Sequence, residues 1–458
     1  MVLDRLLDVA ERAVKTALRM GAYQSQASSF ILDAALTRYA NSQIHQNVAY
    51  KSGGISIRVV LPDRRMGDME AFTLEEEGVE KAVEGAVRIA KASRPNVDFK
   101  GLPEPEPWSP LEGAFDEETS IFTPHDRVQM VREAIETAHS RSPLVRAVAG
   151  NLSTNSAYFA VVNSLGVSAG ASLTTAGMKT TVISELEGTE GFSTAESYSR
   201  RVGDIDPVQL AEEAAERSVK GVKPARVQPG EYEVVLSPLA VRVLFSYICG
   251  MGFSASSYQD GSSFLRYFSG QRVFDEKLNV KDDASDPRTL YMLPIDGEGV
   301  PKRRLNLIRA GEALLEGVCY DSLRAGREDK KSTGHSPPPI GRRLMDRPVP
   351  YNVIVEPGDS NLEEMIEETR SGLFITDLWY IRPVEPTRVV LTGLTRDGTF
   401  LIEDGELSKP VLNLRFTDSM LSALSEIPLL GDEAKTFESN AVPAMKLMKM
   451  RFVGVSAY

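Results

Sequence analysis

Cysteine is nearly absent from this sequence. Only two cysteines, Cys249 and Cys319, occur in 458 residues. Two thiols cannot build a disulfide framework, and their separation matches no zinc-binding motif. A chain without disulfides suits a reducing compartment, so we expect a cytoplasmic protein.

Histidine is also scarce, and its spacing does not favour a metal site. The four histidines are His45, His125, His139 and His335, and no two of them lie three to five residues apart. A catalytic zinc usually needs two or three such ligands meeting at one point. Residues distant in sequence can still converge in a fold, but the pattern itself predicts no metal site in this chain.

Long apolar runs and excess positive charge are missing as well. No stretch of about 18 apolar residues occurs, so no segment is expected to span a membrane. Asp4, Asp8 and Glu11 interrupt the first helical segment, so we do not expect it to be the apolar core of a secretory signal. The net charge of −12 argues against binding to nucleic acid or to anionic membranes, because both need a positive field.

Among the features that are present, the stretch Tyr232–Gly261 is the most informative part of the chain. It predicts a buried strand at 234–236 and a helix that begins at Ser237-Pro238 and ends at Gly250 and Gly252. A loop of small residues is expected behind the helix. Such a loop either binds an extended peptide through its main chain or is a tight structural connection. The candidate residues there are Gly252, Phe253, Ser254, Ser256, Ser257 and Tyr258.

The remaining pattern predicts an α+β protein of two domains. Residues 1–225 should form an α/β sandwich with a mostly antiparallel sheet. Residues 226–458 should form a β-rich domain, barrel-like or a twisted sheet, with helices packed on it. In the first domain we expect three strands, at 24–32, 36–49 and 54–61. The polar middle strand, which includes His45, is a second candidate for lining a peptide-binding cleft.

One short motif suggests a nucleophile. Lys331-Ser332-Thr333-Gly334 has the K-[ST]-G form found in penicillin-recognising serine hydrolases. Those enzymes also need an S-x-x-K segment, and the sequence has none. The sequence also lacks a G-x-S-x-G elbow and a P-loop. The motif is most simply a loop.

Taken in order, several segments resemble the TldD/PmbA family, in particular its PmbA (TldE) branch in an archaeal-type form. The resemblance covers nearly the whole chain. Two departures from the branch are His335, where asparagine is usual, and the divergent segment 379–400. The segments that carry the resemblance are 37–60, NSLGVSAG at 163–170, 236–258, STG at 332–334, 355–378 and EDGELSKPV at 403–411.

The resemblance implies a heterodimeric zinc peptidase built from TldD-type and PmbA-type subunits. In the TldD branch an H-E-x-x-x-H helix and a later cysteine hold the zinc. The corresponding positions here are Ser246, Tyr247 and Met251, and no cysteine follows Cys319. Serine and methionine are poor zinc ligands, and a tyrosine, with an ordinary pKa near 10, is a poor base at neutral pH.

Three hypotheses follow from these observations. In the first, the chain is a metal-free, non-catalytic subunit that pairs with a zinc-bearing TldD-type chain and shapes a cleft for unfolded peptides. The isolated chain can then also form a homodimer. In the second, the chain is a regulator of the gyrase-modulator type that acts through protein contacts. In the third, it is a self-sufficient enzyme that uses Lys331 and Ser332.

Overall fold

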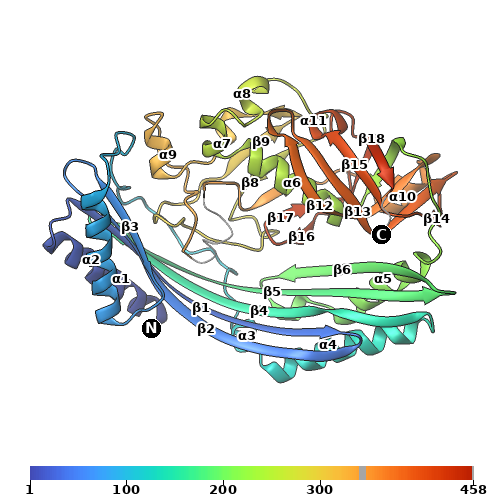
Figure 1. The fold of residues 1–458 in the computed structure, drawn as a ribbon, viewed down its shortest axis with the longest axis horizontal. Helices are drawn as coiled ribbons and strands as arrows, with labels where there is room; N and C mark the ends of the chain where they lie inside the picture. The colour runs from blue at the N-terminus through green and yellow to red at the C-terminus, as the bar shows by residue number, and fades with distance from the viewer. Residues whose placement is uncertain (340–346, 456–458) are drawn as a thin grey trace.

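The computed structural model describes residues 1–339 and 347–455, and three six-stranded sheets organise it (Figure 1). Most strand pairs are antiparallel, and helices pack against the sheets. The predicted α+β class is therefore confirmed. No helix in the described ranges is long and apolar enough to cross a membrane.

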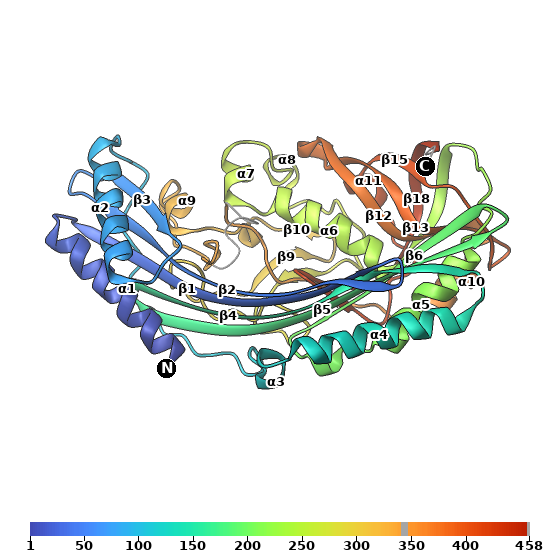
Figure 2. The ribbon, with the colours of Figure 1, turned by 60° about the horizontal axis from the view of Figure 1, so that its bottom comes forward.

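The first sheet has the order β3-β2-β1-β4-β5-β6, and all its neighbours are antiparallel. It is long and curved, and the C-terminal half of the chain lies against its inner side (Figures 1 and 2). Its strands are β1 (Gln24–Ala40), β2 (Gln43–Val60), β3 (Met66–Ala71), β4 (Val145–Asn163), β5 (Ser168–Leu186) and β6 (Thr189–Ser199).

The prediction of three strands between residues 24 and 61 was wrong. The structure has two long strands there, joined by a tight turn at Asn41 and Ser42. Both turn residues have positive φ, 50° and 61°, as a two-residue hairpin of the right twist requires. The predicted polar strand at 36–49 is thus the end of one strand and the start of the next.

Both faces of this sheet are covered, and alternate residues of β4 show it. Val161 packs with Ile295 and other residues of the C-terminal half, whereas the adjacent Val162 packs with the helices on the outer face. Two helices cover one end of the outer face and two cover the other (Figure 2). The helices of this half are α1 (Val2–Arg19), α2 (Glu76–Ala92), α3 (Glu117–Ser120), α4 (Pro124–Arg141) and α5 (Pro207–Lys220), with a 3₁₀ turn η1 (Val202–Asp204).

The second sheet is made of short strands in the order β10-β9-β8-β11-β17-β16. Its one parallel pair among the described strands is β11 with β17. Its strands are β8 (Val280–Asp282), β9 (Leu305–Arg309), β10 (Glu312–Ala313), β11 (Val353–Val355), β16 (Lys435–Phe437) and β17 (Asn440–Val442).

The third sheet has the order β12-β7-β18-β15-β13-β14, and a further pairing of β12 with β13 closes five of its strands into a ring. This closure matches the barrel-like arrangement expected for the C-terminal half. Its strands are β7 (Gly230–Leu236), β12 (Ser371–Glu385), β13 (Val390–Glu403), β14 (Glu406–Pro410), β15 (Leu414–Ser419) and β18 (Met445–Val455).

One long helix, α6, lies between the ring of strands and the second sheet. Its apolar residues, among them Leu244, Phe245 and Ile248, belong to the largest buried cluster of the protein. The helices and turns of this half are α6 (Pro238–Gly252), α7 (Ala255–Gln259), α8 (Leu265–Phe268), α9 (Ser322–Gly326), α10 (Leu362–Glu367), α11 (Met420–Ala423), η2 (Leu315–Gly317) and η3 (Pro386–Arg388). The expected domain boundary near residue 225 falls in the connection from α5 to β7, and the division into two domains stays a prediction.

Candidate functional site

The α6 helix begins as the sequence predicts. The Ser237 hydroxyl accepts a hydrogen bond from the Leu239 N–H at 3.1 Å, and Pro238 occupies the first turn. The preceding strand β7 is parallel to β12 and antiparallel to β18, so the helix is fixed at the centre of the C-terminal half. The three positions that correspond to the zinc motif lie on its last two turns.

Ser246 is engaged with neighbouring groups of this chain. Its hydroxyl donates to the carbonyl of Arg242, one helical turn back, at 2.9 Å. The same hydroxyl oxygen accepts a hydrogen bond from the side-chain amide of Asn440 on β17 at 2.8 Å. Ser246 therefore links α6 to the second sheet.

Tyr247 and Met251 are engaged in a similar way. The Tyr247 hydroxyl donates to the main-chain carbonyl of Ile381 on β12 at 3.1 Å. Met251 is partly buried and packs against the main apolar cluster. The two oxygen-bearing side chains thus reach different strands, and the thioether lies in apolar surroundings. This arrangement does not fit a zinc ion, so we derive no chemical step through a metal at α6.

The segment behind the helix is a second short helix rather than the predicted loop. Residues 252–257 are buried, and α7 starts at Ala255. Its main chain is already paired: Cys319 N–H donates to Phe253 O at 2.8 Å, and Ala255 N–H donates to Cys319 O at 3.1 Å. Gly252 is required because a Cβ there would lie 2.2 Å from the Phe264 ring.

Four of the predicted cleft residues carry polar side chains. Ser254 and Ser256 are buried, and neither hydroxyl has a hydrogen-bond partner among the described residues. The carbonyl of Ser257 accepts hydrogen bonds from main-chain N–H groups of the following turn. Tyr258 is half-buried, and the guanidinium of Arg266 is stacked over its ring at 5.4 Å. Their role in lining a cleft stays a prediction.

The two cysteines are buried near this segment and are not bonded to each other. Burial, together with the nearby Asp282 carboxylate, raises the pKa of both the Cys249 and the Cys319 thiol well above the ordinary range. Thiols in this state are weak nucleophiles. Within residues 1–339 and 347–455, no three histidine, cysteine or acidic side chains are placed to hold a metal ion.

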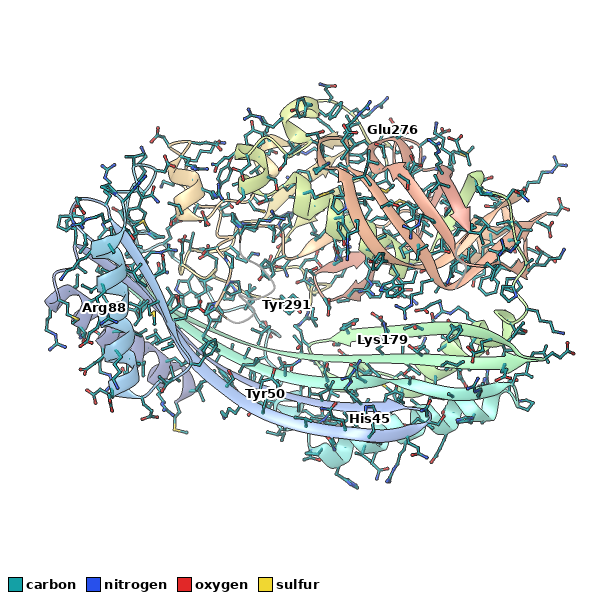
Figure 3. All side chains as sticks on the ribbon, viewed as in Figure 1. His45, Tyr50, Arg88, Lys179, Glu276 and Tyr291 are labelled. Carbon is teal, nitrogen blue, oxygen red and sulfur yellow. The ribbon has the colours of Figure 1, made fainter. Side chains whose placement is uncertain are left out.

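His45 lies far from α6, on the first half of β2. Figure 3 shows His45 and Tyr50 along β2, which is on the side of the first sheet away from β6. Residues 45–51 are all exposed. β3 pairs only with residues 55–60 of β2, so the outer edge of residues 43–54 has no strand beside it among the described strands. This segment, residues 43–54, is called the open edge of β2 below.

The Lys331-Ser332 loop shows no paired base. The Ser332 hydroxyl donates to the Tyr320 carbonyl at 3.0 Å and accepts from the Gly334 N–H at 3.1 Å. His335 is fully buried, and its Nδ1 contacts Thr333 instead of Ser332. The serine is therefore part of a structural turn, as the pattern most simply indicates.

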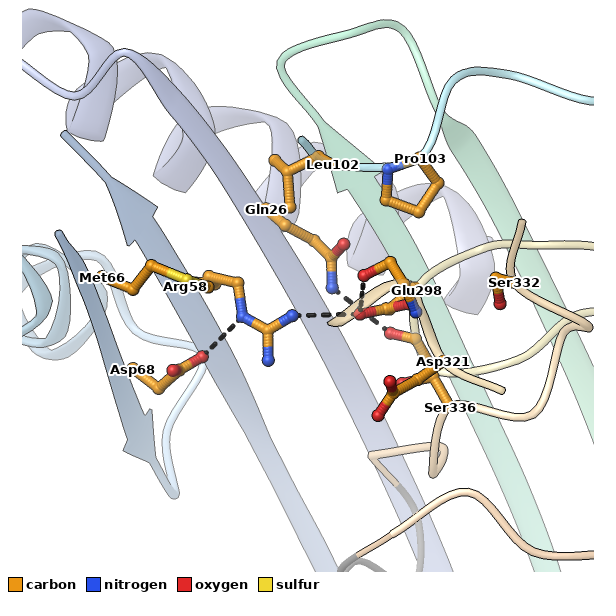
Figure 4. Close-up of polar contacts among 12 residues, drawn as sticks. Gln26, Arg58, Met66, Asp68, Leu102, Pro103, Glu298, Asp321, Ser332 and Ser336 are labelled. Carbon is orange, nitrogen blue, oxygen red and sulfur yellow. Dashed lines mark hydrogen bonds and ion pairs between the residues drawn. The ribbon is translucent and has the colours of Figure 1, made fainter. Parts of the chain in front are cut away.

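The sequence reasoning missed a partly buried charged cluster that joins the two halves of the chain. Arg58 of β2 lies between Asp68 of β3, at 2.9 Å, and Glu298 of the C-terminal half, at 3.0 Å (Figure 4). Burial opposes the charge on Arg58, but the two carboxylates outweigh it and raise its pKa. Burial and the Glu298 charge raise the pKa of Asp321 to about 6.

A second missed cluster surrounds Asp282. This carboxylate is fully buried and accepts main-chain hydrogen bonds from Tyr351 and Asn352. Lys302 lies 3.7 Å and His335 3.4 Å from its other oxygen. Burial opposes ionisation, but Lys302 and His335 outweigh it, so the pKa of Asp282 is lowered. His335, the residue that departs from the branch pattern, therefore lies beside a buried carboxylate.

Comparisons with known proteins agree with the resemblance seen in the sequence. Residues 118–222 match the family described as the PmbA/TldA metallopeptidase central domain, and residues 229–454 match its C-terminal domain. The metalloprotease PmbA of Escherichia coli O157:H7 is 22% identical over 97% of this chain and 96% of its own length. A zinc metalloprotease TldD homologue of Saccharolobus solfataricus is 24% identical over 59% of this chain and 61% of its own length.

Solved structures show the same fold. TldE from Thermococcus kodakarensis superposes with a TM-score of 0.88 at 20% identity, covering 97% of this chain and all of that one (100%). A protein of Thermotoga maritima, described as a modulator of a DNA gyrase, gives a TM-score of 0.87 at 19% identity, with 97% and 99% covered. At these identities the likeness is one of fold.

Proposed function

Because this chain belongs to the PmbA/TldD metallopeptidase family, we propose that it is the metal-free, non-catalytic subunit of a two-chain peptidase. Its partner in this proposal is a TldD-type chain that holds the zinc. The substrate class is unfolded or extended peptide, which is cleaved in a cleft formed by both chains.

The observation that carries the proposal is how three side chains of α6 are bonded and packed. Ser246 and Tyr247 occupy the positions of a ligand and a base, yet each hydroxyl is bonded to a neighbouring strand or helix turn of this chain. Met251 is packed against apolar residues. These side chains stabilise the fold. In this proposal α6 corresponds to the catalytic helix of the TldD branch but carries no zinc ligand and no general base. The zinc chemistry is accordingly assigned to the partner.

The open edge of β2 supports a role in the cleft. A strand edge without a neighbour offers its main-chain N–H and C=O groups to an added strand. An unfolded peptide can bind there regardless of its sequence, because the main chain supplies the hydrogen bonds. His45, Val48 and Tyr50 on this edge are exposed, so their side chains are available to the peptide or to the partner.

The test uses three samples: this chain alone, the TldD-type partner alone, and the two mixed. Each is assayed on an unstructured peptide with and without a chelator, and the zinc content of each chain is measured. We expect peptide cleavage only in the mixture, zinc only in the partner, and loss of cleavage with the chelator. Cleavage by this chain alone that the chelator abolishes would overturn the proposal.

A regulatory role remains the second candidate, and one observation favours it. A structure with this fold carries the description of a DNA gyrase modulator. With a net charge of −12, this chain would act on such a target through protein contacts and not through DNA. A gyrase-related phenotype that persists in cells lacking the TldD-type chain would support this role over the first.

A further inference from the structure

A bulge in β12 places two aromatic side chains next to each other on the surface of the third sheet. Tyr380 and Ile381 stand opposite a single residue of β13, Gly393. In a regular strand successive side chains alternate between faces, so Tyr380 would point away from the face of Trp379. Here Tyr380 has a φ of 55°, and the rings of Trp379 and Tyr380 lie 5.9 Å apart. The two residues are 52% and 53% exposed.

The bulge is held in place by α6 and by Gly393. The Tyr247 hydroxyl of α6 donates to the carbonyl of Ile381 at 3.1 Å. A Cβ at Gly393 would lie 2.2 Å from Cδ1 of Ile381, so the glycine leaves the space into which this buried side chain turns. A left-handed backbone at a bulky residue persists only where the surrounding structure maintains it, and such positions are common at functional sites.

Two arginines fix the orientation of the aromatic rings. The guanidinium of Arg396 lies 4.5 Å from the centre of the Trp379 ring, and that of Arg382 lies 4.8 Å from the centre of the Tyr380 ring. A guanidinium over a ring face is attracted by the negative charge of that face. The two rings are therefore ordered before any partner binds, which reduces the entropy that binding would cost.

The same face continues across β13 to β15, which are neighbouring strands of the third sheet (Figure 1). Trp379 stands opposite Leu394 of β13, and Leu394 stands opposite Arg415 of β15. Residues that stand directly opposite each other share a face. Leu394 and Arg415 are half-buried. We call the face made by Trp379, Tyr380, Arg382, Leu394 and Arg415 the aromatic–arginine patch.

The patch carries positive charge that the chain does not neutralise. Arg382 donates to the main-chain carbonyl of Ile381 at 2.8 Å. Neither Arg382 nor Arg415 has a carboxylate partner in the part of the chain that the structure describes. The chain as a whole has a net charge of −12, so this local excess has the opposite sign. An unpaired guanidinium offers a planar set of donors that matches a carboxylate.

This combination of side chains favours a protein partner over a nucleic acid. Tryptophan, tyrosine and arginine are the residue types that contribute most to the stability of protein–protein interfaces. Nucleic acids also stack on aromatic rings and pair with arginine. A nucleic acid is charged along its whole length, however, and the acidic surface around the patch would repel it. The carboxylates of a protein can be confined to the patch.

We propose that the aromatic–arginine patch is a docking surface for a partner protein that presents carboxylate side chains next to an apolar one. The carboxylates pair with Arg382 and Arg415, and the apolar side chain packs on Trp379 and Leu394. The inference does not depend on the proposed peptidase role.

The probe is the peptide acetyl-Glu-Glu-Leu-Glu-Glu-amide, titrated into the full chain and followed by calorimetry. Its counterpart acetyl-Gln-Gln-Leu-Gln-Gln-amide has the same size without the charges. A peptide bound along the open edge of β2 through its main chain would not distinguish the two, so the difference reports the patch. We expect saturable binding of the acidic peptide, at least tenfold tighter than that of the neutral one. A ten-residue oligothymidylate should bind more weakly than the acidic peptide.

Three results would overturn the proposal: no binding of the acidic peptide, equal binding of the two peptides, or tighter binding of the oligothymidylate. The last of these would assign the patch to nucleic acid.

Two variants locate the site, and one controls for net charge. The double variant Arg382→Gln, Arg415→Gln should weaken binding of the acidic peptide by about tenfold or more, and Trp379→Ala by about fivefold or more. The control Arg88→Gln, Arg132→Gln removes two exposed arginines of α2 and α4, with the same change in net charge, and should leave the affinity unchanged. Circular dichroism checks that each variant is folded. Wild-type affinity in either folded patch variant, or an equal loss in the control, contradicts the assignment.

Discussion

The guanidinium of Arg58 on β2 lies 3.0 Å from the carboxylate of Glu298, and this ion pair joins the first sheet to the C-terminal half. Glu298 is 3% exposed and also accepts two hydrogen bonds from Ser322. Arg58→Met would leave this carboxylate buried without its cation. We expect the free energy of unfolding to fall by about 3 kcal/mol, measured by urea denaturation.

The same substitution at an exposed ion pair is the control for Arg58. Arg272 pairs with Glu276 at 3.1 Å, and both side chains are mostly exposed, 65% and 72%. Arg272→Met should cost less than about 1 kcal/mol, because water solvates both charges when the pair is broken. Equal losses for the two variants would show that the Arg58 pair is not a structural link.

Asp377 should make the stability depend on pH. Burial raises its pKa to about 7, with Arg242 opposing and Asp397 adding to the rise. The folded pKa thus lies above the unfolded value of about 3.9. The folded state binds the extra proton between these values, so this contribution to stability is present at low pH and is lost as pH rises toward 7.

The measurement compares the wild-type chain with Asp377→Asn, which mimics the neutral carboxyl. Urea midpoints are determined at pH 5 and at pH 8. The wild type should lose stability relative to the variant as the pH increases over this range. A difference between the two proteins that is the same at both pH values would rule out Asp377 as the source.

The local parts of this fold could be predicted from the sequence. The start of α6 is determined by Ser237 and Pro238, which act within one turn, and the glycines near residue 252 mark its end. The hairpin at Asn41 and Ser42 was missed because it has no glycine or proline. Polar residues continue on both sides, so nothing in the pattern separates the turn from the strands.

The clusters between the halves could not be predicted. Arg58 and Glu298 are 240 residues apart in the sequence. From the sequence alone, each of them would be assigned to the surface. Asp397 looks like a turn residue beside Gly398, since Asp-Gly is a common hairpin signal. Only the pairing of β12 with β13 shows that this dipeptide forms a bulge inside a sheet. Such information lies in tertiary contacts.

Tyr247 provides a test of the proposed non-catalytic role. Among the described residues its hydroxyl makes one hydrogen bond, to Ile381. Tyr247→Phe should therefore lower the free energy of unfolding by about 1 kcal/mol. It should leave the cleavage rate of the mixture with the TldD-type partner unchanged. A fall in that rate of tenfold or more, with the two chains still associated, would assign the hydroxyl a chemical role.

The open edge of β2 can be tested by placing positive charge on it. Lysine on an edge strand opposes the addition of another strand. Val48 and Tyr50 are exposed, so the double variant Val48→Lys, Tyr50→Lys should fold normally and lower peptide cleavage in the mixture by about tenfold. Tyr23→Lys, at an exposed site outside this edge, is the control. Unchanged cleavage in the double variant would remove the open edge from the cleft.

Two glycines of α6 give opposite predictions for the same substitution. A Cβ at Gly252 would lie 2.2 Å from a ring atom of Phe264, which is itself fully buried against Phe253 and Phe274. Gly252→Ala must displace that ring and should cost about 1–3 kcal/mol. A Cβ at Gly250 meets nothing within 4 Å, so Gly250→Ala should stabilise the helix by up to about 1 kcal/mol. Thermal unfolding of both variants measures the contrast. Equal shifts in Tm would mean that close packing of α6 against Phe264 does not determine the glycine at 252.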